Sequence, residues 1–144
     1  ELLTETVKSM GIPKDVYRLL FDDALKLVYG DARQLERVFI NLMKNAMEAM
    51  YQREEKRLFI WARPADSTPF MVVDVTDNGE GIPQEKIDKI WVAFYTTKGD
   101  RGGTGLGLAA CTKIISQLGG KITVDSEVGV GTTFSVYLPA VKGT

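Results

Sequence analysis

The chain has 144 residues, of which 44% are hydrophobic and 26% are charged, and these values fit one globular domain with a substantial core. A formal net charge of -1 argues against electrostatic binding of nucleic acid, and the sequence contains no apolar run of about 18 residues that would predict a membrane span. The single cysteine excludes an internal disulfide, and the absence of histidine excludes Ser-His-Asp and Cys-His catalytic arrangements.

The first 30 residues predict one short helix followed by two strands. Residues 1–10 carry apolar side chains at helical spacing, and this helix is expected to end before Pro13. Two apolar runs, Tyr17 to Phe21 and Leu25 to Val28, predict two short strands joined by an acidic turn.

The longest predicted element is an amphipathic helix from Asp31 to Tyr51, with Asp31 as its N-cap. A polar stripe runs beside its apolar face and consists of Arg37, Asn41, Asn45 and Glu48. Asparagine weakens a helix by roughly a few tenths of a kcal/mol, because its side chain competes for backbone hydrogen bonds. Asn41 and Asn45 therefore form either an ordinary solvated face or a pair of oxygen ligands for Mg²⁺ and the phosphates that it bridges.

A hairpin is expected after this helix, with strands from Leu58 to Arg63 and from Phe70 to Thr76. Side chains alternate along a strand, so Asp77 falls on the same face as the apolar residues of the second strand. A lone carboxylate on the core side is costly unless it has a hydrogen-bonding partner. A bound ligand is the candidate for that partner.

The stretch that follows predicts a tight turn, a short helix and a lid. Residues Asp77 to Pro83 contain two glycines and form the turn, and Gln84 to Trp91 is expected to be helical. The polar, glycine-rich residues Ala93 to Thr104 have no periodicity, so we interpret them as a mobile surface loop.

The end of the chain predicts a further helix and two strands. The helix begins at Gly105, buries Cys111 as a small core residue and ends at Gly119. Lys121 to Asp125 and Thr133 to Leu138 are expected to be strands of the same sheet.

One glycine motif imitates a dinucleotide-binding fingerprint. Gly105-x-Gly107-x-x-Ala110 fits its relaxed form, and Asp125 follows at a strand end. The fingerprint needs a buried strand running into its first glycine, whereas residues 97–104 are polar and rich in glycine. We therefore reject a Rossmann fold, and the sequence also lacks a Walker-type phosphate loop and the signatures of Ser/Thr/Tyr kinases.

Five short motifs instead form a consistent set along the chain. They are Asn41-x-x-x-Asn45-Ala46 (N box), Asp77-x-Gly79-x-Gly81 (first glycine box), Phe94-Tyr95-Thr96-Thr97-Lys98 (F box), Gly103-Thr104-Gly105-Leu106-Gly107-Leu108 (second glycine box) and Gly129-x-Gly131-Thr132 (last box). This set resembles the ATP-binding catalytic domain of sensor histidine kinases, in the wider GHKL superfamily of gyrase, MutL and the heat-shock chaperone ATPases. The resemblance covers residues 30–139 and implies a Bergerat ATP-binding fold, an α/β two-layer sandwich with a mixed sheet of about five strands and three helices on one face.

The resemblance also implies roles for the two ends of the site. Asp77 would accept the exocyclic amine of adenine, with Thr132 nearby through water. Asn45, with Asn41, would hold Mg²⁺, and amides at the glycine-rich start of the last helix would bind phosphate oxygens. The implied nucleotide contacts are Asn41, Asn45, Asp77, Gly79, Gly81, Ile82, Thr97, Lys98, Gly103, Thr104, Gly105, Leu106, Gly107, Leu108 and Thr132.

Asn45 and Lys98 are the implied catalytic residues, and Arg101 would add positive charge beside Lys98. Two positions depart from the family pattern. Glu48 stands where many relatives carry a basic residue, and Trp91-Val92-Ala93 replaces the usual acidic-proline lead into the F box. A phosphate contact at Glu48 is therefore not expected.

Three activities are compatible with such a pocket: a sensor histidine kinase, a GHKL-type ATPase of the gyrase or MutL kind, and an anti-sigma-factor-type kinase. In the ATPases the base that activates water is a Glu four residues before the magnesium Asn, and here that position is Asn41. The lack of this carboxylate favours phosphoryl transfer over hydrolysis. The aromatic F box favours a sensor kinase over an anti-sigma factor.

Residues 1–144 are expected to form a single ATP-binding catalytic domain, with residues 1–12 as the tail of an upstream dimerisation and phosphoacceptor region. The implied cofactors are ATP and Mg²⁺. The implied partners are a His-bearing dimerisation domain of the parent kinase and the receiver domain of a response regulator, with no nucleic acid and no direct membrane contact. We expect a cytoplasmic, monomeric isolated domain and a homodimeric parent that is free to be membrane-anchored.

Overall fold

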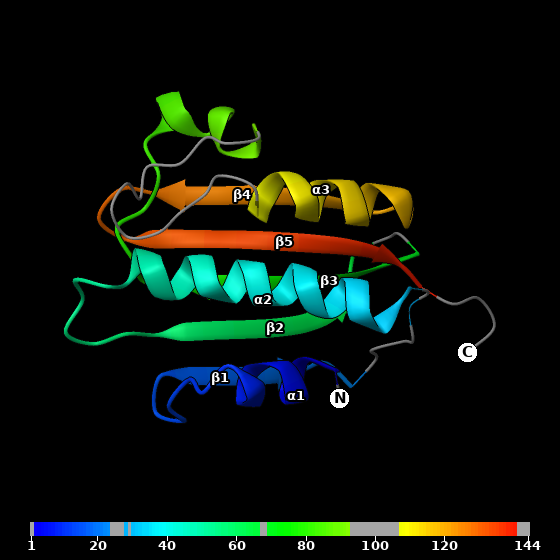
Figure 1. Ribbon diagram of the computed structural model, residues 1–144, viewed down its shortest axis with the longest axis horizontal. Coiled ribbons are helices and arrows are strands. Elements are labelled where there is room, and N and C mark those ends of the chain that lie inside the picture. The colour runs from blue at the N-terminus through cyan, green and yellow to red at the C-terminus, as the bar shows by residue number, and fades with distance from the viewer. Residues whose placement is uncertain (1, 24–27, 29, 67–68, 93–106, 141–144) are drawn as a thin grey trace.

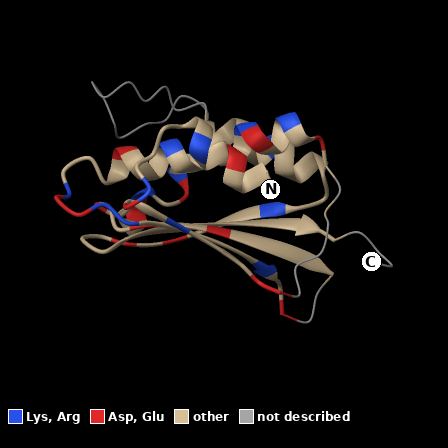
Figure 2. Ribbon diagram, turned by 90° about the horizontal axis from the view of Figure 1, so that it is seen from below, with Lys and Arg blue, Asp and Glu red and all other residues tan. Residues whose placement is uncertain are grey.

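The computed structural model describes residues 2–23, 28, 30–66, 69–92 and 107–140. The elements in chain order are α1 (Leu2–Ser9), β1 (Tyr17–Phe21), α2 (Ala32–Ala49), β2 (Leu58–Pro64), β3 (Phe70–Asp77), η1 (Gln84–Lys86), η2 (Lys89–Trp91), α3 (Gly107–Gln117), β4 (Lys121–Glu127) and β5 (Gly131–Pro139). The strands form one mixed sheet in the order β1-β2-β3-β5-β4, and α1, α2 and α3 lie on one of its faces (Figures 1 and 2). The expected α/β two-layer sandwich is confirmed.

The central helix of the upper layer is α2, with α1 on one side and α3 on the other (Figure 1). The carboxylate of Asp31 caps its first turn by accepting a hydrogen bond of 2.8 Å from Arg33 N. Its apolar stripe faces the sheet, and Val38, Leu42 and Met43 are completely buried there. The predicted amphipathic helix is confirmed, and its buried face fixes the direction of the polar stripe beside it.

The predicted hairpin is formed by β2 and β3, which pair antiparallel with Leu58 opposite Asp77. On its other edge β3 pairs antiparallel with β5, so that Asp77 also lies opposite Thr132. The end of β3 is therefore held on both sides by neighbouring strands. This double pairing fixes the backbone of Asp77 within the sheet.

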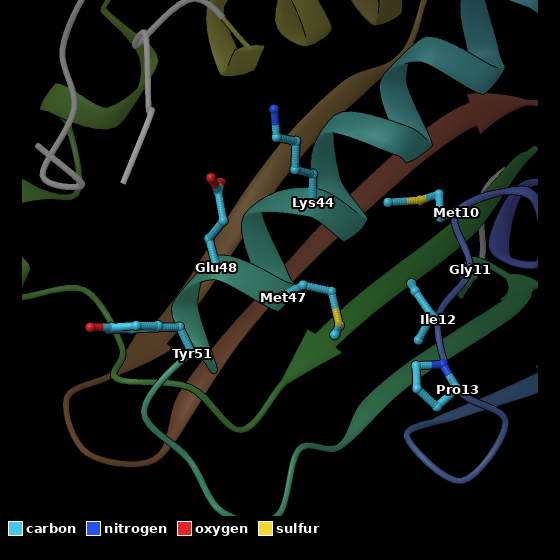
Figure 3. Close-up of a pocket in the computed structure, with 8 residues that line it drawn as sticks. All are labelled: Met10, Gly11, Ile12, Pro13, Lys44, Met47, Glu48 and Tyr51. Carbon is cyan, nitrogen blue, oxygen red and sulfur yellow. The ribbon is translucent and has the colours of Figure 1, made fainter. Parts of the chain in front are cut away.

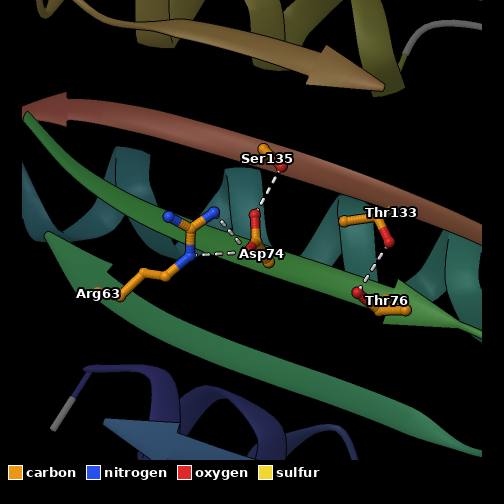
Figure 4. Close-up of polar contacts among 5 residues, drawn as sticks. All are labelled: Arg63, Asp74, Thr76, Thr133 and Ser135. Carbon is orange, nitrogen blue, oxygen red and sulfur yellow. Dashed lines mark hydrogen bonds and ion pairs between the residues drawn. The ribbon is translucent and has the colours of Figure 1, made fainter. Parts of the chain in front are cut away.

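The sheet face away from the helices carries a polar network (Figure 4). The carboxylate of Asp74 accepts hydrogen bonds from Arg63 Nη2 at 3.0 Å and from Ser135 Oγ at 2.6 Å. The hydroxyls of Thr76 and Thr133 lie 2.9 Å apart and share a hydrogen bond. These contacts join β2, β3 and β5 on the face opposite to the helices.

The strand expected from Tyr17 to Phe21 is confirmed as β1, whereas only Val28 of the strand expected from Leu25 to Val28 lies among the described residues. β1 pairs in parallel with β2, with Tyr17 opposite Leu58, and Val28 forms an isolated antiparallel bridge with Ala140. Residues 24–27 lie outside the described residues. β1 pairs with the edge of β2 that β3 leaves open. This pairing satisfies backbone N–H and C=O groups of β2 that would be costly to leave unpaired.

The helix count of three was too low. Residues 84–91 form the two short 3-10 helices η1 and η2, in addition to the α-helices α1, α2 and α3. In these two helices Ile90 alone is buried, so the segment lacks the apolar face that supports a continuous helix. In the part of the chain that the structure describes, no helix has both the length and the apolar character needed to cross a membrane.

Candidate functional site

The carboxylate of Asp77, at the end of β3, is 6% exposed and lies among the glycine-containing loops. Its Oδ1 accepts a hydrogen bond of 2.8 Å from Gly79 N. Burial raises the pKa of Asp77 to about 6, whereas hydrogen bonds from the backbone of Gly79 and Thr132 oppose this rise and the charge of Glu80 adds to it. A buried carboxylate in such a setting is a candidate acceptor for a ligand's hydrogen-bond donor.

Two glycines allow the loops to pack closely around this carboxylate. Gly81 has a φ of +77°, and a Cβ atom there would collide with the carbonyl oxygen of Glu127. Gly131 has a φ of +150°, and a Cβ atom there would collide with the carbonyl oxygen of Asp77. Glycine is required at both positions, because another side chain would be strained and would also push the loops apart.

The loop after Asp77 is also joined to the end of α2. The backbone N–H of Glu80 donates to the carbonyl oxygen of Ala49 at 3.1 Å. Asn45 lies one helical turn before Ala49 on the same helix. This bond therefore ties the predicted base-binding loop to the helix that carries the predicted metal ligands.

Asn41 faces the start of α3. A Cβ atom on Gly107 would lie 3.4 Å from Asn41 Oδ1. Burial raises the pKa of the Cys111 thiol to about 11, and a hydrogen bond with the side chain of Asn41 opposes that rise. The structure thus brings Asn41 and Gly107 together, while the half-buried Asn45 lies one turn further along α2. Cys111 itself is fully buried, as the sequence predicted.

Sequence reasoning missed Ser126 of β4. Its Oγ accepts a hydrogen bond of 2.8 Å from Ile82 N, donates one of 3.0 Å to Gly131 O and lies 2.7 Å from Thr132 Oγ1. A hydroxyl has one proton, so when Ser126 donates to Gly131 the shared proton comes from Thr132. The available signal was weak: a hydroxyl on the inner side of a strand whose other inward residues are apolar.

A separate hollow of about 590 Å³ lies on the flank of α2 that faces the end of α1 (Figure 3). Its lining consists of Met10, Gly11, Ile12, Pro13, Lys44, Met47, Glu48 and Tyr51. Glu48, a member of the predicted polar stripe, is therefore part of this lining. The hollow is lined largely by apolar side chains, which distinguishes it from the surroundings of Asp77.

The remaining predicted site residues divide into two groups. Ile82 and Leu108 are half-buried, and both pack against the hydrophobic core. The residues that lie outside the described residues are Thr97, Lys98, Arg101, Gly103, Thr104, Gly105 and Leu106. The predicted lid and the F box lie in that same part of the chain.

Comparison with known proteins connects this geometry to a family. The model of the histidine kinase-, DNA gyrase B- and HSP90-like ATPase family matches residues 30–142. The catalytic domain of histidine kinase ThkA, in a nucleotide-free form, has a TM-score of 0.78 and 30% sequence identity, over 96% of this chain and 90% of that chain.

Full-length relatives give the same result. Sporulation kinase C of Bacillus subtilis (strain 168) is 41% identical over 113 residues, which are 78% of this chain and 25% of that protein. Sensor histidine kinase ZraS of Escherichia coli (strain K12) is 37% identical over 122 residues, which are 85% of this chain and 25% of ZraS. The chain thus spans about a quarter of the length of these curated relatives.

These matches confirm the resemblance to sensor histidine kinases that the five motifs indicated. They also agree with the two-layer fold. The chain belongs to the family of histidine kinase-, DNA gyrase B- and HSP90-like ATPases.

Proposed function

We propose that this chain is the Mg·ATP-binding catalytic domain of a sensor histidine kinase, which transfers the γ-phosphoryl group of ATP to a histidine on a separate dimerisation domain. Family membership and the sensor-kinase relatives support this assignment. The sequence contains no histidine, so the acceptor imidazole has to come from outside these 144 residues.

The observation that carries the proposal is the buried Asp77 carboxylate, held by Gly79 N at the end of a central strand. A carboxylate accepts hydrogen bonds only, which matches the exocyclic amine of adenine as a donor. Thr132 lies opposite Asp77 in the sheet, and its hydroxyl is oriented by Ser126. We assign Asp77 to the base and Thr132 to a water-mediated contact beside it.

The phosphate end of the site is assigned to α2 and α3. The side-chain oxygens of Asn41 and Asn45 are hard ligands of the kind that Mg²⁺ prefers, and Asn41 Oδ1 already faces Gly107. Bound Mg²⁺ would neutralise charge on the phosphates. The N-terminal amides of α3, with its glycine-rich approach, would bind phosphate oxygens, because a helix N-terminus favours anions. Lys98 and Arg101 are proposed to add positive charge.

Phosphoryl transfer by this site rests on positioning. The site residues fix the nucleotide from both ends, so that an incoming imidazole can align with the γ-phosphoryl group. A carboxylate at position 41 would activate water, whereas the amide of Asn41 is a poor base. We therefore propose slow hydrolysis by the chain alone. A response-regulator receiver domain is the proposed next acceptor, and a homodimer the proposed state of the parent.

The test is a labelling experiment with γ-labelled ATP. The chain alone should bind ATP, acquire no label and release phosphate slowly, because it has no histidine to accept the phosphoryl group. With a His-bearing hairpin from the parent kinase, the label should appear on the hairpin and be lost in acid, as expected for a phosphoramidate. A hairpin with its histidine replaced by alanine is the control.

Rapid phosphate release by the isolated chain, with no labelled hairpin, would contradict this proposal. That result would support the alternative of a GHKL-type ATPase.

A further inference from the structure

The guanidinium of Arg53, in the connection between α2 and β2, is bonded to two loops of the site. Its Nε donates to Asn78 O at 2.9 Å, and its Nη2 donates to Gly79 O at 3.1 Å and to Gly129 O at 2.8 Å. The first two acceptors belong to the turn after Asp77, and the third to the turn between β4 and β5. One side chain thus joins three segments that are distant in sequence.

One of these bonds reaches the Asp77 carboxylate through a single peptide group. The carbonyl of Asn78 and the N–H of Gly79 belong to the same planar unit. Arg53 donates to the carbonyl side of this unit, and its N–H side donates to Asp77 Oδ1 at 2.8 Å. Hydrogen bonds in such a chain polarise one another, and the charge of the guanidinium strengthens the first of them. Arg53 therefore fixes both the orientation and the donor strength of the group that holds Asp77.

The backbone around Arg53 is itself fixed. Arg53 N donates to Met50 O at 2.9 Å, at the end of α2. The side chain of Asn78 forms two further bonds to the same connection: its Oδ1 accepts from Arg57 N at 2.9 Å, and its Nδ2 donates to Glu55 O at 2.9 Å. The guanidinium therefore extends from a braced segment, and its planar fork matches carbonyls that a lysine ammonium cannot engage in the same geometry.

We propose that Arg53 is a positioning residue that determines selectivity for 6-aminopurine nucleotides, by holding the Asn78–Gly79 peptide group against the Asp77 carboxylate. The inference rests on the proposed function, because it takes Asp77 as the acceptor of the adenine amine. Arg53 needs no contact with the nucleotide in this role. It acts on the carboxylate, and the carboxylate acts on the base.

The test compares two ligands of the full chain by calorimetric titration with Mg²⁺: ATP, and purine riboside triphosphate, which lacks the exocyclic amine. Wild type should prefer ATP. Arg53→Met should weaken ATP binding by about tenfold and binding of purine riboside triphosphate by less than about twofold, because only the contact between Asp77 and the amine depends on the peptide group that Arg53 holds. Arg57→Met is the matched control: its guanidinium pairs with Glu55 at the surface, and its backbone N–H to Asn78 remains.

Each outcome decides a different claim. A wild type that binds the two ligands equally would overturn the proposed function of Asp77. If wild type prefers ATP and Arg53→Met keeps the same preference, because it binds both ligands equally well or loses both equally, the role of Arg53 is overturned. If Arg53→Met melts below the temperature of the titration, Arg53→Lys replaces it. This variant should prefer ATP over purine riboside triphosphate, but less strongly than wild type does. A preference equal to that of wild type would contradict the inference.

Discussion

Burial of the Asp77 carboxylate makes the folded protein less stable as pH rises. Its pKa is raised from 3.8 to about 6, so between these values the folded state holds a proton that the unfolded state has released. The free energy of unfolding should therefore fall across this window, by about 3 kcal/mol in total at the conversion of 1.36 kcal/mol per pKa unit. The protein keeps a costly ionised group where a ligand's donor can relieve that cost.

Asp77→Asn should remove this dependence. The neutral amide does not ionise, so the variant is expected to be more stable than wild type above pH 7, by about 1 to 2 kcal/mol after loss of one acceptor oxygen. Urea denaturation at pH 5 and pH 8 measures the change. Asp125→Asn, at an exposed position of β4, controls for the loss of a carboxylate. A variant that loses stability between the two pH values as steeply as wild type would contradict the assignment.

At the scale of elements, the site depends on how β4 and β5 hold the loop after β3. Ser126 of β4 connects these segments, since its hydroxyl contacts Ile82 N, Gly131 O and Thr132 Oγ1. Ser135 has a similar hydroxyl contact, to Asp74, but on the opposite face of the sheet. Replacing each serine in turn therefore distinguishes an effect on the stability of the sheet from an effect on the shape of the site.

Ser126→Ala and Ser135→Ala should each destabilise the protein by about 1 kcal/mol, the typical net value of a hydrogen bond. Only Ser126→Ala should also weaken adenosine binding, because only Ser126 orients Thr132 and the loop at Ile82. Thermal melts and titrations with adenosine measure both effects. Equal adenosine affinities in the two variants would remove Ser126 from the site.

At the scale of the whole molecule, the elements with strong periodicity were predictable. The helix α2 and the hairpin of β2 and β3 follow from apolar spacing alone, and Asp77 falls on the core side because strand residues alternate. The partner of β1 was not predictable, because strand pairing is decided by which sheet edge is open, and local sequence does not encode this. The helix expected from Gln84 to Trp91 is instead two short 3-10 helices, because this segment carries helix signals but has no apolar face to bury.

The site shows the same division. The motif residues Asp77, Gly131 and Thr132 lie together, and Gly81 packs against Glu127, since glycines mark where loops approach one another closely. Arg53 was missed, because its acceptors lie 25, 26 and 76 residues away in sequence, and no local pattern reports such contacts. A positioning residue becomes visible only when distant segments are in place.

The central claim is that one nucleotide lies across the site, with its base at Asp77 and its metal-bound phosphates at Asn45. Calorimetric titration of wild type, Asn45→Ala and Asp77→Asn with ATP and with adenosine, in the presence of Mg²⁺, tests this most directly. Asn45→Ala should lose ATP affinity by about tenfold or more and keep its adenosine affinity, because adenosine has no phosphates for a metal to bridge, whereas Asp77→Asn should lose affinity for both ligands. Equal losses of ATP and adenosine affinity in Asn45→Ala would contradict the account.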